Sequence, residues 1–190
     1  MKTIVRPVLV LFFFLSVICC LVYPLLVFGI GQAAFPGQAN GSIMLREGQP
    51  VGSILIGQAF TSPRYFWGRP SATAPMPNNA ASSGGSNLGP TNPALIDGIK
   101  ARIEALKAAD PGNRMAIPVD LVTASASGLD PELSVAAADY QIARIARERQ
   151  LPRERIQALV DANSKARLFG FLGEPRVNVL ALNLALDNMR

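Results

Sequence analysis

The stretch VLVLFFFLSVICCLVYPLLVFGI, residues 8–30, decides the architecture of this chain. Its 23 residues carry no charge, and 17 of them are Leu, Ile, Val or Phe. At about 1.5 Å per residue, a helix of this length reaches roughly 35 Å and can cross the ~30 Å hydrocarbon core of a bilayer. The stretch therefore predicts a transmembrane helix, Val8–Ile30, with a kink at Pro24.

Three other interpretations of this segment are weaker. A signal peptide has an apolar region of about 7–15 residues, which is much shorter than this one, although Gly31–Ala33 resembles a cleavage site. A lipoprotein needs a small residue before its modified cysteine, whereas Ile18 precedes Cys19. A buried helix of a soluble core would show a polar face, and none interrupts the run. A membrane anchor is the favoured interpretation.

The charges beside the helix predict its orientation. Lys2 and Arg6 precede it, whereas residues 31–45 carry no charge. The positive-inside rule then places residues 1–7 in the cytoplasm and the remainder of the chain outside. Because Cys19 and Cys20 both lie inside the predicted helix, we expect no disulfide and no cysteine metal site in the exported part.

The remainder is expected to form one soluble α+β domain, residues 51–190, joined by an irregular neck over residues 31–50, with early strands and late helices. Periodicity, turn signals and caps predict the following elements: strands over 51–60 and 64–67, a long loop over 71–93, a helix over 93–109, a strand over 116–125, a helix capped by Ser134 and ending near 149, a helix from 152, and a helix over 177–188.

Composition excludes several functions. The net charge of +5 falls to +3 without Lys2 and Arg6, and the densest basic stretch, residues 144–155, also contains Glu148 and Glu154. This pattern is typical of a solvated helix surface, so we expect no nucleic-acid partner. The chain has no histidine, which removes Ser-His-Asp catalysis and most zinc chemistry. We predict neither a catalytic residue nor a metal ligand.

Two candidate sites remain open from the residues alone. An anchored Ser-Lys hydrolase would need a buried lysine, and the lysines of the domain, Lys100, Lys107 and Lys165, are all expected on amphipathic helices. The loop Ser83-Gly84-Gly85-Ser86-Asn87 suits a nest of backbone donors for an anion, or an ordinary tight loop. No phosphate-binding glycine motif is present.

Several strings, taken in order, resemble the C subunit of the Kdp-type potassium-transporting P-type ATPase. The resemblance spans nearly the whole chain around a single N-terminal membrane helix. The strings that carry it are Tyr23-Pro24-Leu25, Asn40-Gly41-Ser42, Gly52-Ser53, Leu55-Ile56-Gly57-Gln58, Phe66 with Gly68-Arg69-Pro70-Ser71-Ala72-Thr73, Ser83-Gly84-Gly85-Ser86-Asn87-Leu88, residues 118–130 (PVDLVTASASGLD), Gln141, Val177-Asn178-Val179 and residues 182–187 (LNLALD).

The resemblance implies a non-catalytic, single-pass subunit of a potassium uptake complex in the bacterial inner membrane, with its C-terminal domain in the periplasm. It implies three partners: a channel-like potassium-binding subunit, a P-type ATPase subunit and a small single-helix subunit, besides membrane lipid. It also implies a role in stabilising the assembly and, as a catalytic chaperone, in raising the ATP affinity of the P-type subunit. No cofactor is expected to bind tightly, and ATP is possible through the complex.

The same resemblance indicates site residues. If ATP touches this chain, the expected contacts are residues 83–87 and Gln141, for which the alternative is a surface or subunit-contact glutamine. Subunit contacts are expected at Tyr23 and Pro24 in the anchor, and at Phe66, Trp67 and Arg69 in the domain, because aromatic and arginine side chains dominate interfaces. Phe66 and Trp67 have the domain core as their alternative. An external domain and cytoplasmic ATP would require coupling through the membrane helices.

Overall fold

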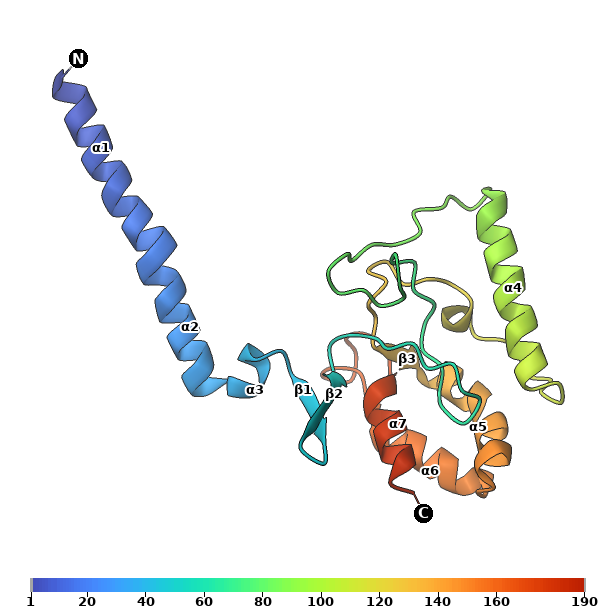
Figure 1. Ribbon diagram of the computed structural model, residues 1–190. Helices are drawn as coiled ribbons and strands as arrows, with labels where there is room; N and C mark the ends of the chain where they lie inside the picture. The colour runs from blue at the N-terminus through green and yellow to red at the C-terminus, as the bar shows by residue number, and fades with distance from the viewer. Residues whose placement is uncertain (1, 190) are drawn as a thin grey trace. The chain divides into compact units, whose positions relative to one another are not determined.

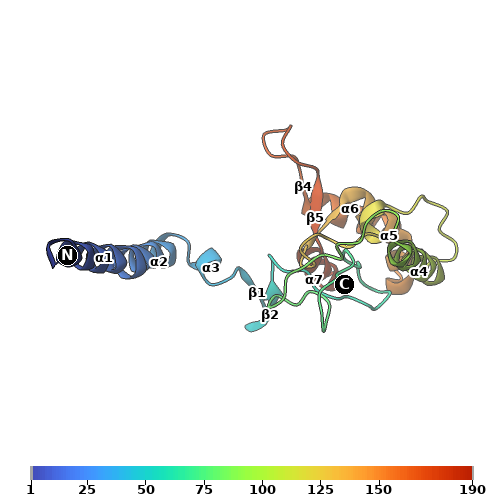
Figure 2. The same ribbon diagram turned by 90° about the horizontal axis from the view of Figure 1, so that it is seen from above.

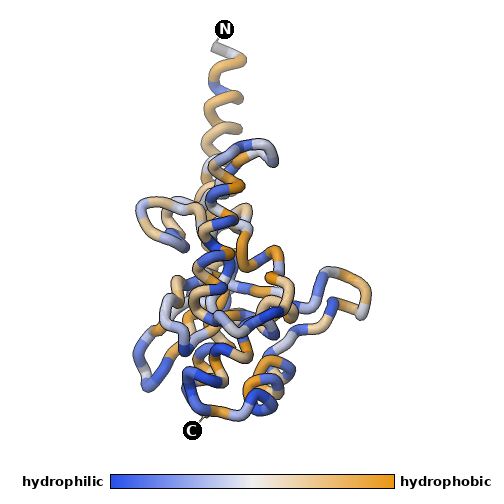
Figure 3. Tube along the Cα trace, turned by 90° about the vertical axis from the view of Figure 1, so that its right-hand side faces the viewer, coloured by the Kyte–Doolittle hydropathy of each residue, from blue (hydrophilic) through white to orange (hydrophobic). Residues whose placement is uncertain are grey.

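A computed structural model describes residues 2–189 and divides the chain into two compact units, residues 1–51 and residues 52–190. In the first unit, α1 (Lys2–Val17) continues through the π-helical turn η1 (Ile18–Val22) into α2 (Tyr23–Ala34) (Figure 1). In the helical stretch Thr3–Ala34, the most apolar 18-residue window has a mean hydropathy of 2.8 and is 0% buried. Figure 3 shows the apolar character of this helix. The predicted apolar helix is confirmed, and it extends beyond residues 8–30 at both ends.

The disturbance expected at Pro24 takes the form of a π-helical turn. Pro24 has no N–H to donate to the carbonyl four residues earlier. The backbone N–H of Tyr23 bonds instead to the carbonyl of Ile18, five residues back, which closes the π-turn directly before the proline. Such single π-turns relieve local irregularity without ending a helix.

The rest of the first unit is more regular than predicted. After α3 (Pro36–Ala39), strand β1 (Ile43–Arg46) pairs with β2 (Gln49–Ser53). The two connecting residues, Glu47 and Gly48, have φ of 53° and 77°. Positive φ at both central positions is the geometry of a tight hairpin turn. The expectation of an irregular neck over residues 31–50 is therefore wrong, because this stretch contains the end of α2, the short helix α3 and a hairpin with a Glu-Gly turn.

The second unit combines helices with a small antiparallel sheet (Figures 1 and 2). The sheet has the strand order β3-β5-β4, with Leu133 opposite Val177. Helix α5 contacts α6, α6 contacts α7, and all three contact β5. The α+β fold class is confirmed. The elements are α4 (Pro93–Ala109), the 3-10 turn η2 (Val119–Leu121), β3 (Glu132–Ser134), α5 (Val135–Arg149), α6 (Arg153–Asn163), β4 (Ser164–Lys165), β5 (Arg176–Asn178) and α7 (Val179–Asp187).

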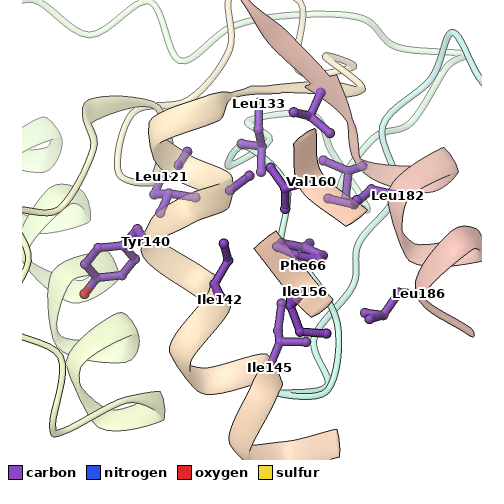
Figure 4. Close-up of a cluster of buried hydrophobic side chains, with 14 of the residues drawn as sticks. Phe66, Leu121, Leu133, Tyr140, Ile142, Ile145, Ile156, Val160, Leu182 and Leu186 are labelled. Atoms are coloured by element: carbon purple, nitrogen blue, oxygen red, sulfur yellow. The ribbon is translucent and has the colours of Figure 1, made fainter. Parts of the chain in front are cut away.

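The core of this unit lies between α5, α6, α7 and an extended segment around Phe66 (Figure 4). Phe66, Ile145, Ile156, Leu182 and Leu186 are all 0% exposed. Burying each such side chain contributes on the order of 1.5–3 kcal/mol, so this cluster dominates the stability of the unit. The core therefore joins residues from both ends of the second unit.

The helix predictions are confirmed, and the predicted caps form. The side chain of Asn92 accepts a hydrogen bond from the N–H of Ala94 at 3.0 Å, and Ser134 accepts one from Ala137 at 3.1 Å. Each satisfies a backbone donor that the helix itself cannot. The last helix begins two residues later than predicted, because residues 176–178 pair with β3 as strand β5. Residues 71–92 contain no helix or strand in the described structure, as predicted.

The strand predictions are largely wrong. Only residues 51–53 of the predicted strand over 51–60 belong to a strand, residues 64–67 belong to none, and the predicted strand over 116–125 contains the 3-10 turn η2. The apolar and β-branched residues at these positions are used for core burial in irregular segments. Burial alone does not require a neighbouring strand, so composition misled the prediction.

Candidate functional site

The extended segment around Phe66 and Trp67 is held by two side-chain amides. Asn183 accepts from the N–H of Phe66 at 2.9 Å and donates to its carbonyl at 3.0 Å. Gln141 does the same for Trp67, accepting at 2.8 Å and donating at 3.1 Å. Each amide thus makes the pair of bonds that an antiparallel neighbour strand would make. The segment is extended but needs no strand beside it.

A buried arginine completes this arrangement. Arg144 is 2% exposed and donates to the side-chain oxygen of Gln141 at 2.6 Å, to the carbonyl of Tyr65 at 3.1 Å and to the carbonyl of Pro63. Its guanidinium lies 4.2 Å from the centre of the Trp67 ring. Burial lowers the pKa of Arg144 to about 10, which still leaves it charged at neutral pH. It orients Gln141 and braces one face of Trp67.

Arg69 lies two residues further along the same segment. Its guanidinium forms a salt bridge with Asp130 at 3.0 Å, and the other carboxylate oxygen of Asp130 accepts from the N–H of Glu132. This salt bridge connects the segment around Trp67 to the residues directly before β3. The Nε atom of Arg69 is buried and has no acceptor in the described structure.

A cavity of about 370 Å³ opens beside this segment, against α4 and η2. Its lining includes Phe60, Trp67, Arg69, Arg102, Leu106 and Leu121. Arg102 projects from α4 and donates to the carbonyl of Val122 at 2.7 Å, and its burial lowers its pKa. No Asp or Glu occurs among the lining residues. The cavity is therefore basic and otherwise mainly apolar.

The predicted nucleotide loop lies elsewhere in the second unit. The N–H of Gly84 and the hydroxyl of Ser83 both donate to the carbonyl of Ser127, at 2.9 and 3.0 Å. A Cβ on Gly85 would lie 2.8 Å from the carbonyl oxygen of Ala126. The loop is thus packed on residues 125–128, and none of residues 83–87 lines the cavity. Its proposed role in anion binding stays a prediction.

The structure brings together four of the predicted site residues and separates the others. Phe66, Trp67 and Gln141 are in direct contact, with Arg69 on the same segment. Phe66 is in the core, and Gln141 is 1% exposed with its amide bonded internally. Both side chains are buried within the second unit in this conformation, and their roles at an interface or a nucleotide stay predictions. Tyr23 and Pro24 lie in the first unit, where Tyr23 is 64% exposed.

The lysines do not build a hydrolase site. Lys100 and Lys107 are exposed on α4, and Lys165 is exposed beside Glu132, 3.8 Å from its carboxylate. A Ser-Lys mechanism needs a desolvated, neutral lysine as the base. The alternative of an anchored Ser-Lys hydrolase is therefore not favoured.

An exposed apolar hairpin was not predicted from the sequence. The hairpin that joins β4 to β5 projects from the unit (Figure 2). At its tip Leu168, Phe169, Phe171 and Leu172 are 59%, 79%, 71% and 46% exposed. The tip is ordered by mutual hydrogen bonds between Leu168 and Leu172, both at 2.9 Å. We call these four residues the hairpin tip. The sequence signal was the string LFGFL, in which a central glycine separates apolar pairs.

Sequence reasoning also missed Arg102, Arg144 and Asn183. Arg144 was assigned to a solvated helix surface, because its stretch is rich in charges. Asn183 stood inside an apolar helix, where a lone asparagine is a signal of buried hydrogen bonding.

Comparisons with known proteins cover almost the whole chain. The family model described as "K+-transporting ATPase, c chain" matches residues 5–188. A protein named "Potassium-transporting ATPase KdpC subunit" from Janthinobacterium sp. (strain Marseille) is 65% identical over 187 residues, 98% of this chain and 99% of that protein. Proteins of the same name from Herminiimonas arsenicoxydans and Methylibium petroleiphilum are 66% and 63% identical, over 98% and 100% of this chain and 98% and 100% of each relative.

Proposed function

The chain belongs to the KdpC family, the c chain of K+-transporting ATPases, and on that premise we propose that it is a non-catalytic, single-pass membrane subunit that stabilises the assembled transporter. The observation that carries the proposal is the match over residues 5–188, which includes both the anchor and the folded unit. The relatives have the same extent, so they share the whole architecture.

The partners that we propose are a channel-like potassium-binding subunit, a P-type ATPase subunit that binds and hydrolyses ATP, and a small single-helix subunit. The exposed anchor supports this assignment, since a helix whose side chains are all available can pack against other membrane helices. Tyr23, next to the π-turn, is the aromatic contact that we propose within the membrane. The bacterial inner membrane, with the second unit in the periplasm, is the proposed location.

The second proposed contact is the hairpin tip, docked into an apolar pocket of a partner subunit. Arg167 pairs with Glu174 at 2.8 Å, and Glu132 is shared by Arg176 at 2.6 Å and Lys165 at 3.8 Å, so most of the positive charge of the hairpin is compensated within the protein. Phe169 is held at a φ of 54°, a conformation that a non-glycine residue adopts at a cost. An apolar tip whose backbone is hydrogen-bonded into one shape is well suited to a protein pocket.

Co-purification tests the assembly. An affinity tag on this chain is expected to recover the channel-like and P-type subunits together from detergent-solubilised membranes. Recovery of this chain alone would contradict the proposal. The effect on ATP affinity is tested by comparing this complex with the partner subunits purified through a tag on the P-type subunit from cells that lack this chain. ATP hydrolysis should require higher ATP concentrations when this chain is absent.

The hairpin tip has its own test. Changing Phe169 and Phe171 together to Asp should remove most partner recovery while leaving the chain folded and membrane-bound, because both side chains are solvent-exposed. The matched control is Val119→Asp, a change at an exposed apolar residue outside the hairpin (69% exposed). Unchanged recovery with the double variant would exclude the tip as a subunit contact.

A further inference from the structure

The cavity beside Trp67 is lined by two arginines, Arg69 and Arg102, and by no carboxylate. Arg69 has one carboxylate partner, Asp130, which lies outside the cavity lining. Arg102 has none among the described residues, and its one hydrogen bond is to the neutral carbonyl of Val122. Two guanidinium groups therefore line a partly enclosed space, and only Arg69 has a carboxylate partner, which lies outside that lining.

Guanidinium groups in such surroundings favour anions. Removing a charged group from water costs several kcal/mol unless an opposite charge or strong hydrogen bonds compensate. The Nε–H of Arg69 is buried without an acceptor in the described structure, so the polarity of this guanidinium is only partly compensated by the protein. A potassium ion is excluded by the same argument, because it would meet two positive charges and no carboxylate.

The remaining walls restrict the ligand further. Phe60, Trp67, Leu106 and Leu121 supply apolar surface, and a volume of about 370 Å³ is at the lower end of small-molecule sites. A bare inorganic anion would leave this apolar surface uncovered. An anion joined to an apolar body would use both features of the cavity.

From this geometry we propose that the cavity binds an organic anion, with a phosphate or carboxylate against Arg69 and Arg102 and an apolar portion against Phe60 and Trp67. The free molecule and the headgroup of an anionic lipid share this chemistry. The proposal concerns the second unit alone and does not depend on the assembly of the transporter.

Trp67 makes the proposal testable, because it is the only tryptophan of the chain and it lines the cavity. The full chain in a neutral detergent is titrated with phenyl phosphate, benzoate, inorganic phosphate and potassium chloride while its tryptophan fluorescence is followed. Anionic phosphatidylglycerol in mixed micelles is the fifth probe. A saturable change with phenyl phosphate or benzoate, and a much weaker response to the two inorganic salts, is expected if the ligand is a free molecule. A saturable response to the lipid alone identifies a headgroup.

Two variants locate the binding. Arg102→Met should weaken the apparent affinity by about tenfold or more, since a charged hydrogen bond contributes roughly 1.5–3 kcal/mol. Ala105→Phe places a ring on α4 at the cavity wall and should block binding without removing charge, which keeps the test valid if Arg102→Met does not fold. Lys100→Met removes the same charge from an exposed position of α4 and should bind like the unaltered chain.

Three results would overturn the proposal. The first is the absence of a saturable response to every organic anion and to the lipid. The second is an equal response to inorganic phosphate and phenyl phosphate, which would show that the apolar walls contribute nothing. The third is an equal affinity in Ala105→Phe and Lys100→Met, which would place the binding elsewhere.

Discussion

At the scale of single residues, the side chains of Asn183 and Gln141 make the hydrogen bonds that a neighbouring strand would otherwise make to the backbone. Together their amides satisfy the N–H and the carbonyl of both Phe66 and Trp67. An unpaired buried backbone group costs roughly 1–3 kcal/mol, so these two residues decide whether the segment can enter the core. Arg144 reinforces the arrangement by bonding to the oxygen of Gln141.

We therefore expect Asn183→Leu to be strongly destabilising although leucine has a similar size. The change leaves the N–H and carbonyl of Phe66 buried without partners, and it should lower the free energy of unfolding by about 2–4 kcal/mol. Urea denaturation of the detergent-solubilised chain, followed by Trp67 fluorescence, measures this loss. Asn188→Leu, at an exposed position at the end of α7, is the control and should change stability by less than about 0.5 kcal/mol.

At the scale of elements, the long loop over residues 71–92 is held by close packing rather than by secondary structure. Ser71 donates to the carbonyl of Gly128 at 2.7 Å and accepts from the N–H of Asn78 at 2.9 Å. Gly128 itself has a φ of 68°, and a Cβ there would lie 2.5 Å from the Thr73 methyl group and 2.6 Å from the carbonyl oxygen of Gly84. One glycine thus allows two parts of the loop to meet residues 125–128.

Gly128→Ala should accordingly loosen the packing of the loop over residues 71–92 against residues 125–128. Both the positive φ and the two close contacts oppose a methyl group, so we expect a loss of about 2–4 kcal/mol and faster proteolysis within residues 71–92. Limited proteolysis with identification of the cleavage sites gives the location of the effect. Gly112→Ala is the matched control, since its Cβ would meet no atom within 4 Å. Equal proteolysis of the two variants would contradict this account of the loop.

At the scale of the whole molecule, the charges that flank the anchor set a directional preference. Lys2 and Arg6 precede it, and the first charged residue after it is Arg46. We expect the N-terminus in the cytoplasm and the second unit in the periplasm. On that arrangement, any influence on cytoplasmic ATP binding has to pass through the membrane helices, as a coupling free energy between two sites.

A single cysteine reports the orientation. In a background with Cys19 and Cys20 changed to Ala, Ser86→Cys at an exposed loop position should react with a membrane-impermeant thiol reagent in cells whose outer membrane is permeabilised. Thr3→Cys, at the other end of the anchor, should react only after the inner membrane is broken. The reverse pattern would place the second unit in the cytoplasm.

Local signals made several parts of this structure predictable. The apolar run at residues 8–30 is self-sufficient, since a membrane helix satisfies its own backbone and needs only apolar side chains. Asn92 and Ser134 predicted helix starts because a cap bonds within three residues of itself. The ordered strings at residues 66–73 and 118–130 indicated the family, and the comparisons confirmed it.

Long-range contacts account for what could not be predicted. The sequence by itself determined the anchor, the α+β class, the helices and the family, because each depends on residues close together in the chain or on an ordered pattern along it. Only the tertiary structure decided that Asn183 and Gln141 replace a strand for Phe66 and Trp67, 117 and 74 residues apart, and that Arg69 and Arg102 share a cavity. Those outcomes depend on how α5 and α7 pack on the segment around Phe66, which is far from both helices in the sequence. Local sequence patterns do not encode such long-range packing.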